Sequence, residues 1–268
     1  MSPLVMGVLN VTPDSFSDGG DWSDTDAAMA RGRDLLAEGA HVVDVGGEST
    51  RPGALPVPIE VELERVIPVI AGLRDDVAAA GARLSTDTRH AEVARAAVAA
   101  GASIVNDVSA SLHDVAAETG AGWVAMHMQG TPGTMQDAPR YVDVVAEVLE
   151  TLVAVADAAR SAGVDECWID PGIGFGKTFD HNWALLADLD RFVATGIPVA
   201  VGTSRKGFLG AALAAADGSE RVPAPDDRIE ASVTTALWAA TMGAAMIRVH
   251  DVAATVTALD AHRVGGAV

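Results

Sequence analysis

The chain has 268 residues, of which 49% are hydrophobic and 21% charged, and this composition supports a full hydrophobic core and excludes a disordered chain. The formal net charge of −19 argues against nonspecific binding to nucleic acid or to an anionic membrane. A single cysteine, Cys167, excludes an intramolecular disulfide and a thiolate zinc site. Because no signal peptide pattern and no membrane-spanning apolar stretch is found, we expect a cytoplasmic enzyme.

Eight short, apolar, β-branched runs recur along the chain, each followed by a loop and a helix-like stretch. The predicted strands are Leu4–Leu9, His41–Val45, Arg83–Thr86, Ser103–Asn106, Trp123–Met126, Cys167–Ile169, Pro198–Gly202 and Ala245–Val249. The predicted helices lie near 24–38, 60–80, 90–100, 113–119, 141–162, 181–194, 229–242 and 252–262, and residues 216–227 are expected to form a surface loop. This alternation indicates parallel strands with right-handed crossovers. Eight units favour a closed (β/α)8 TIM barrel, an α/β fold in a single domain over residues 1–268.

Polar or charged residues stand where the predicted strands end. They are Asn10, Asp44, Asp87, Asn106, Asp107, His127, Asp170, Ser204, Arg205, Lys206, Arg248 and His250. In a barrel these positions converge on the C-terminal rim, where barrel enzymes carry their active sites. The first two loops, 11–22 and 47–58, are long and rich in Pro, Gly, Asp and Ser, which is typical of lids and binding loops.

The predicted rim divides into a basic and an acidic part. Arg205, Lys206 and Arg248 follow the last two strands, with His250 beside them and Arg51 in the second loop, which favours a phosphate or pyrophosphate site. The opposing Asp87, Asn106 and Asp170 offer the acceptors and donors that read the polar edge of a heterocycle. Spacing alone gives only weak support for a metal ion at Asn10.

Several other polar residues have two interpretations. Lys177 is either a surface charge or part of the site, and His127 is either a rim residue with structural partners or a catalytic group. The pair Met126 and Met128 favours core packing over contact with a flat ligand.

Eight segments together resemble bacterial dihydropteroate synthases. They are GVLNVTPDSFSDGG (7–20), VDVGGESTRPGA (43–54), STDT (85–88), ND (106–107), MHMQGTPGTMQDAPRY (126–141), DPGIGFGKTFDHN (170–182), VGTSRKGFLG (201–210) and IRVHDV (247–252). Any one of them is uninformative, but the set is specific because the segments occur in the family's order and at compatible spacing.

The resemblance implies a TIM barrel that joins 6-hydroxymethyl-7,8-dihydropterin diphosphate to 4-aminobenzoate and yields 7,8-dihydropteroate and pyrophosphate. It implies Mg²⁺ as cofactor, with Asn10 as its contact, and a homodimer with small-molecule substrates. The implied catalytic residues are Asp87, Asp170, Lys206, Arg248 and His250. The implied pterin diphosphate contacts are Thr50, Asp87, Asn106, Asp170, Lys206, Arg248 and His250, and those for aminobenzoate are Phe16, Arg51, Pro52 and Ser204. Sensitivity to sulfonamides is expected as well.

Two departures from the family pattern fall outside these positions. Thr86 stands where an aliphatic residue is usual, and Ala110 where glycine is frequent. Three other functions remain as alternatives: a non-catalytic pterin-binding paralogue, a pterin-dependent methyltransferase barrel that passes a methyl group to a corrinoid, and a phosphosugar barrel. The acidic set argues against the last, and the two cationic segments argue against the methyltransferase.

Overall fold

The computed structural model describes residues 2–12, 21–50 and 53–265. Its strands are β1 Leu4–Asn10, β2 Val42–Gly46, β3 Arg83–Asp87, β4 Ile104–Asp107, β5 Gly122–Met126, β6 Cys167–Asp170, β7 Ala200–Val201 and β8 Met246–Val249. They pair in parallel in the order β6-β5-β4-β3-β2-β1-β8-β7. An isolated parallel bridge between Ile169 and Val199 links the two ends of this sheet. The predicted barrel of eight parallel strands is therefore confirmed.

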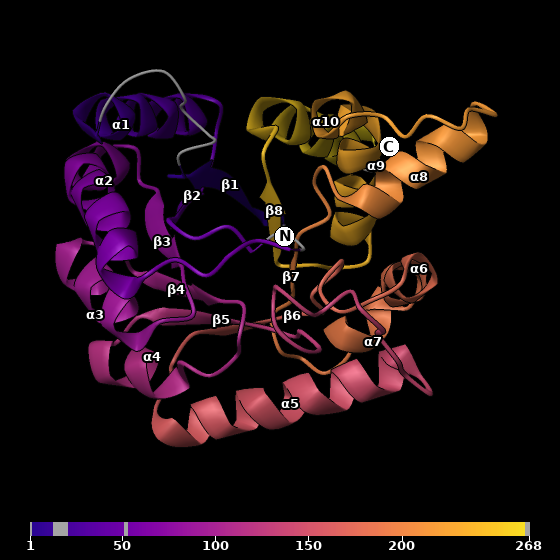
Figure 1. The fold of residues 1–268 in the computed structure, drawn as a ribbon, viewed down its shortest axis with the longest axis horizontal. Coiled ribbons are helices and arrows are strands. Elements are labelled where there is room, and N and C mark those ends of the chain that lie inside the picture. The colour runs from indigo at the N-terminus through magenta and orange to yellow at the C-terminus, as the bar shows by residue number, and fades with distance from the viewer. Residues whose placement is uncertain (1, 13–20, 51–52, 266–268) are drawn as a thin grey trace.

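Helices surround the strands, as Figure 1 shows. They are α1 Asp21–Ala37, α2 Ile59–Ala79, α3 Ala91–Ala100, α4 His113–Thr119, α5 Val144–Ala162, α6 Phe179–Ala187, α7 Leu189–Val193, α8 Gly207–Ala216, α9 Ile229–Thr241 and α10 Val252–Gly265, with a 3-10 helix, η2, at Pro225–Arg228. In the part of the chain that the structure describes, none of these helices has the length and hydropathy needed to cross a membrane.

The strand predicted over Pro198–Gly202 is shorter in the structure, β7 Ala200–Val201, and the helical predictions differ in three places. The helix predicted over 181–194 is two helices, because Asp188 leaves the helical conformation at φ −101° and ψ 25°. Helix α8 directly follows Lys206 and was not predicted, since its two glycines disguise a helical segment. The predicted surface loop over 216–227 is mostly exposed, but it runs into the 3-10 helix η2 at its end.

The inward-facing residues of the barrel change character along each strand. The end of the barrel nearer the strand N-termini is filled by an apolar cluster, here called the floor, of Met6, Val42, Ile104, Val124, Trp168, Ala200 and Met246. Side chains two residues apart on a strand point to the same side. Two residues further along these strands stand Val8, Asp44, Asn106, Met126, Asp170, Gly202 and Arg248. Polar side chains thus enter the barrel directly above an apolar floor.

Candidate active site

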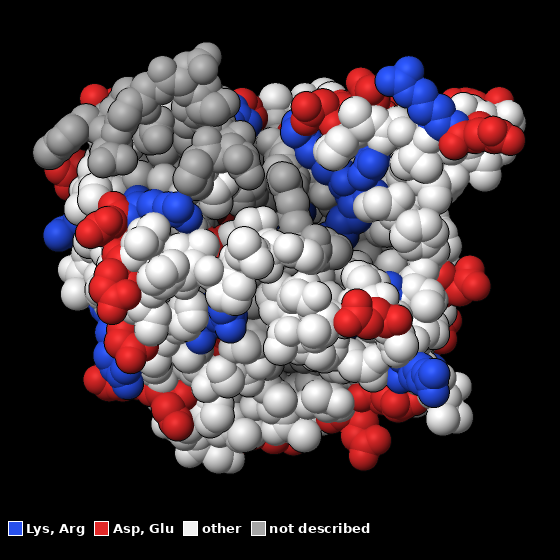
Figure 2. Space-filling model, in the orientation of Figure 1, with Lys and Arg blue, Asp and Glu red and all other residues white. Residues whose placement is uncertain are grey.

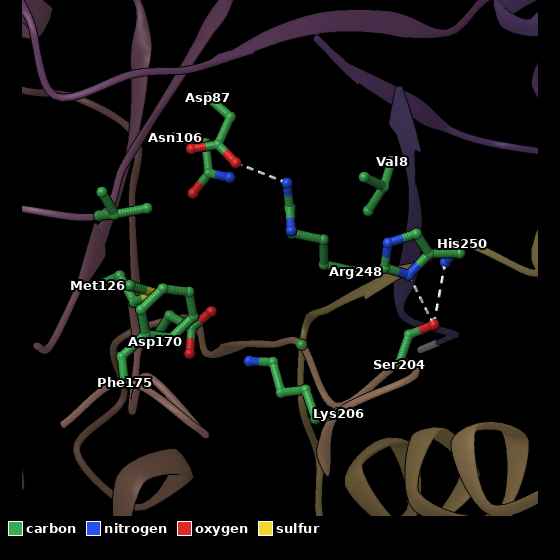
Figure 3. Close-up of a pocket in the computed structure, with 12 residues that line it drawn as sticks. Val8, Asp87, Asn106, Met126, Asp170, Phe175, Ser204, Lys206, Arg248 and His250 are labelled. Carbon is green, nitrogen blue, oxygen red and sulfur yellow. Dashed lines mark hydrogen bonds and ion pairs between the residues drawn. The ribbon is translucent and has the colours of Figure 1, made fainter. Parts of the chain in front are cut away.

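A pocket opens above the floor, at the C-terminal ends of the strands (Figure 3). It is lined by Val8, Asp87, Asn106, Val108, Met126, Asp170, Phe175, Gly202, Ser204, Lys206, Arg248 and His250. Seven of these are residues that the sequence predicts for the site. Basic side chains lie beside the central hollow of this face, while acidic ones gather around its periphery (Figure 2).

Arg248 joins three strands at the pocket wall. Its Nη2 donates to Asp87 Oδ2 at 2.7 Å and its Nε to Asp44 Oδ2 at 2.7 Å. Asn106 Nδ2 also donates to Asp44 Oδ2, at 2.9 Å. Asp44 is 0% exposed, so this carboxylate lies beneath the pocket and holds two of its lining residues. The guanidinium is fixed by charge-assisted bonds from two sides.

The environment of Asp87 disfavours its charge. Burial raises the pKa of Asp87 to about 7, and the negative charges of Asp44, Glu62 and Asp107 act in the same direction. Arg248 opposes this rise but is shared with a second carboxylate. The pocket therefore holds a carboxyl group that changes protonation near neutral pH.

Asp170 and Lys206 are two further charged residues that line the pocket. Asp170 Oδ1 accepts from the Gly172 N–H at 2.8 Å, and burial raises the pKa of this carboxyl while Lys206 opposes the rise. Burial lowers the pKa of Lys206 to about 8. Lys206 Nζ donates to Ile173 O and lies 4.8 Å from the centre of the Phe175 ring. The ammonium is thus directed into the pocket, on the side where Asp170 and Phe175 lie (Figure 3).

Ser204 and His250 lie together at the side of the pocket. Ser204 Oγ is 3.0 Å from His250 Nδ1, and the His250 N–H donates to the same oxygen at 3.1 Å. They follow β7 and β8, which are neighbours in the barrel. Arg248 and His250 both line the pocket, as their spacing of two residues predicts.

Lys177 is a buried residue, so its interpretation as a surface charge is wrong. It is 2% exposed, donates to the backbone oxygens of Phe175 and His127 at 3.0 and 3.3 Å, and lies 3.0 Å from His127 Nδ1. Burial and the charge of Lys177 lower the pKa of His127 to about 3. His127 does not line the pocket formed by the described residues. The pair joins the loop after β5 to the loop after β6, which carries Phe175.

Gly172 allows these two loops to approach each other. It has φ +67°, and a Cβ there would lie 1.8 Å from the backbone oxygen of His127. Only glycine fits a position with both a left-handed conformation and such a close backbone approach. The DPG segment after β6 therefore helps to set the position of Phe175.

The remaining predicted site residues either do not line the pocket or lie outside the described residues. Asn10 and Thr50 are described and half-buried, but neither lines the pocket formed by the described residues. Phe16, Arg51 and Pro52 lie outside the described residues. The expectation that Arg205 belongs to an anion site is not supported by its contacts. It pairs with Asp226 and Asp251 and does not line the described pocket.

The sequence did not predict five of the lining residues for the site: Val8, Val108, Met126, Phe175 and Gly202. Val8, Met126 and Gly202 each stand two residues beyond a floor residue, so the two-residue period could have identified them. The preference for pure core packing at Met126 was therefore incomplete. Phe175 lies on a loop, where no periodic signal is available.

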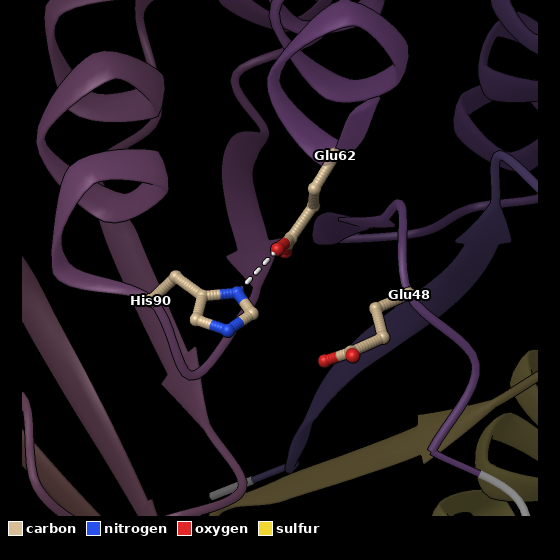
Figure 4. Close-up of side chains that lie close together, drawn as sticks. All are labelled: Glu48, Glu62 and His90. Atoms are coloured by element: carbon tan, nitrogen blue, oxygen red, sulfur yellow. Dashed lines mark hydrogen bonds and ion pairs between the residues drawn. The ribbon is translucent and has the colours of Figure 1, made fainter. Parts of the chain in front are cut away.

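Among the residues that the structure describes, one group of side chains outside the pocket could hold a metal ion: Glu48, Glu62 and His90 (Figure 4). Their ligand atoms lie within 4.8 Å of one another. Glu62 is fully buried and lies 2.6 Å from His90 Nδ1. However, Arg89 Nε and Nη2 already donate to the two oxygens of Glu48, at 2.8 and 3.0 Å. A metal ion would have to displace this guanidinium, so the group fits an internal ion-pair network better.

Comparison with known proteins agrees with this geometry. A family model described as pterin binding enzyme matches residues 6–250. A dihydropteroate synthase of Mycobacterium leprae is 51% identical over 263 residues, which cover 95% of this chain and 90% of that protein.

Two solved structures extend the match to the fold. The Xanthomonas albilineans dihydropteroate synthase with 4-aminobenzoic acid matches with a TM-score of 0.89 at 49% identity, covering 100% of this chain and 94% of that one. The dihydropteroate synthase of the same organism in complex with 7,8-dihydropteroate matches with a TM-score of 0.85 at 46% identity, covering 100% and 95%. The chain therefore belongs to the pterin binding enzyme family and, within it, to the dihydropteroate synthases.

Proposed function

We propose that this pocket is where the chain condenses 6-hydroxymethyl-7,8-dihydropterin diphosphate with 4-aminobenzoate to give 7,8-dihydropteroate and pyrophosphate. The observation that carries the proposal is the convergence of Asp87, Asn106 and Asp170 opposite Lys206 in one buried pocket. Carboxylates and an amide supply the acceptors and donors that a pterin edge requires. Met126 and Phe175 add apolar surface for its flat ring.

The charges of the pocket suit a substrate that becomes cationic. The C–O bond at the pterin methylene breaks, the pyrophosphate leaves with the electron pair, and the ring nitrogens release electrons into the resulting cation. Asp87 and Asp170 then face a developing positive charge, which they stabilise more strongly than the neutral ring. The amine nitrogen of 4-aminobenzoate forms the new bond to the methylene carbon and loses one proton, which the released pyrophosphate can accept. No strong base is required.

The departing pyrophosphate needs cationic partners near the pocket mouth. Arg248 and His250 are placed to contact it in the proposal, and Thr50 is assigned to it by resemblance. Arg248 is already bonded to two carboxylates, so its remaining N–H groups are those available to an anion. Ser204 beside His250 suits the carboxylate end of aminobenzoate, where the resemblance also assigns Phe16, Arg51 and Pro52.

A magnesium ion fits this site only together with the substrate. Asn10 offers one neutral oxygen at the end of β1, two residues beyond Val8, which lines the pocket. Mg²⁺ is commonly held by few protein ligands plus substrate phosphates, so Asn10 would hold it beside the diphosphate. There the ion would neutralise charge on the leaving group.

The homodimer is part of the proposal as well. Phe179 and Trp183 on α6 and Ile229 and Trp238 on α9 are large apolar residues with exposed fractions of 37–51%. Trp238 Nε1 donates to Leu186 O on α6, which brings the two helices together. Exposed apolar groups of this kind favour association with a second copy, and light scattering on the purified protein would measure its mass.

The experiment that tests the function follows pyrophosphate release with Mg²⁺ and the pterin diphosphate, with and without 4-aminobenzoate. Multiple turnovers that depend on the amine are expected. Tight binding without turnover would instead indicate the non-catalytic paralogue, and methyl transfer to a corrinoid would indicate the methyltransferase. Sulfonamide sensitivity stays a prediction, which turnover undisturbed by excess sulfamethoxazole would contradict.

A further inference from the structure

Strand β2 contributes one carboxylate that lies under the pocket without lining it. Asp44 is 0% exposed and faces inward, two residues beyond the floor residue Val42. Its Oδ2 accepts from both Arg248 Nε and Asn106 Nδ2. Its Oδ1 is buried without a hydrogen-bond partner among the described residues. A fully buried carboxylate with an unpartnered oxygen is costly, so its presence requires an explanation beyond packing.

We propose that Asp44 is a positioning residue for the condensation, which fixes Arg248 and Asn106 from below and prevents Arg248 from pairing with Asp87 alone. This inference rests on the proposed function of the same pocket.

The geometry of the guanidinium supports this role. Arginine and a carboxylate commonly form two parallel hydrogen bonds, which would engage both oxygens of the carboxylate. Asp44 instead holds Arg248 through Nε, and Asp87 receives one bond from Nη2, at Oδ2. The contacts of the described residues engage only Oδ2 of Asp87. Its Oδ1 can therefore accept a hydrogen bond from an N–H group of the pterin. The carboxamide of Asn106 is held through its nitrogen, which turns its oxygen away from Asp44.

The charge of Asp44 also acts on Asp87. The groups that influence Asp87 are Arg248 on β8, Asp44 on β2, Glu62 on α2, Asp107 on β4 and Lys206 after β7. The substitution Asp44→Asn removes a negative charge and releases Arg248 toward Asp87. Both changes lower the pKa of Asp87, so the two effects have the same sign.

The test compares the pH profiles of kcat/KM for the pterin diphosphate in the wild type, Asp44→Asn and Asp107→Asn. For Asp44→Asn we expect a loss of about 10- to 100-fold at the optimum, as for a misplaced binding group, and an acidic limb shifted to lower pH by roughly one pH unit. Asp107 is equally buried and accepts N–H groups of Ser109, Ser111 and Leu112. Because the charge of Asp107 raises the pKa of Asp87 less than the charge of Asp44 does, Asp107→Asn should move the limb by less, and it tests whether loss of any buried carboxylate moves the limb equally.

An unchanged acidic limb in Asp44→Asn, or an equal shift in Asp107→Asn, would overturn the proposal. If Asp44→Asn does not fold, Asp44→Ser leaves room for water to reach both donors and should show the same shift. Failure of both variants to fold would assign Asp44 to the fold and also overturn the proposal. If the wild type binds the pterin diphosphate without turnover, the proposed condensation is wrong, whatever the role of Asp44. The role of Asp44 can then still be tested by calorimetry, from the pH dependence of the Kd for the pterin diphosphate in the wild type and in Asp44→Asn.

Discussion

The two ends of the barrel use the same strands for opposite purposes. At the floor, Ile104 and its neighbours are fully apolar, whereas two residues further along come Asp44, Asn106, Asp170 and Arg248. The floor gains stability from burial. The charged groups of the pocket are destabilised by desolvation, which raises the pKa values of Asp87 and Asp170. The apolar floor can thus offset the desolvation of the charged pocket, because both are built on the same strands.

This contrast predicts that a pocket substitution removes activity while the fold persists. In Asp170→Asn the side chain can still accept from the Gly172 N–H but no longer carries the charge that faces Lys206. We expect kcat/KM for the pterin diphosphate to fall about 10²- to 10³-fold. Pyrophosphate release measures the loss, and circular dichroism checks the fold. Activity within a few-fold of the wild type would remove Asp170 from the proposed machinery.

A floor substitution should do the opposite. Ile104→Ala opens a cavity in the floor and should lower the free energy of unfolding by about 2–5 kcal/mol, while KM stays close to that of the wild type. Urea denaturation gives the stability, with Ile104→Val, expected to cost about 0.5–1.5 kcal/mol, as the graded control. A large rise in KM with little loss of stability would mean that the two ends are not separable.

The two ends should also respond differently to pH. Since the pKa of Asp87 is raised to about 7 and that of Lys206 is lowered to about 8, kcat/KM should be highest between these values. It should fall on either side, as Asp87 gains a proton and Lys206 loses one. A flat profile from pH 6 to 9 would contradict this assignment.

The same two groups also contribute to the free energy of unfolding, and their contributions change with pH in opposite directions. Between 3.8 and about 7 the folded chain binds the Asp87 proton more tightly than the unfolded chain, so this contribution to stability falls as pH rises. Between about 8 and 10.5 the unfolded chain binds the Lys206 proton more tightly, so this contribution rises with pH. Urea denaturation of the wild type and Lys206→Met across the alkaline range would isolate the Lys206 contribution.

The smallest expected effect concerns a buried hydroxyl with no role in the pocket. Thr86 Oγ1 is buried without a partner among the described residues, at the position where the family usually has an aliphatic residue. Thr86→Val should therefore raise the free energy of unfolding by about 1 kcal/mol and leave activity unchanged. Thr88→Val is the matched control, because Thr88 Oγ1 accepts from the His90 N–H, and it should lower stability.

The sequence predicts the parts of this site that follow from strand periodicity. Asp87, Asn106, Asp170 and Arg248 stand at or next to the C-terminal ends of their strands, so their convergence follows once eight parallel strands are recognised. Phe175 and the burial of Lys177 depend on how two irregular loops pack, which no local pattern encodes. Arg205 is the opposite kind of error, because the sequence predicts it for the site and the structure does not place it there. It shares a basic segment with Lys206, but its contacts with Asp226 and Asp251 lie in the tertiary structure.

The other departure from the family pattern has a local explanation. Ala110 has φ +51°, a left-handed conformation that favours glycine. The sequence therefore retains the backbone conformation for which the family frequently uses glycine, at a cost in strain. The position follows Ser109 in the loop that Asp107 organises through its hydrogen bonds to Ser109 and Ser111.

The most direct test of the charged pocket is a comparison of binding and turnover in Asp87→Asn. Asparagine keeps a side-chain oxygen near the pterin but removes the charge that is proposed to stabilise the cation. Calorimetric Kd for the pterin diphosphate should change by less than about 10-fold, while kcat should fall about 10²-fold or more. Equal losses in Kd and kcat would contradict the account, because Asp87 would then act in recognition rather than on the transition state.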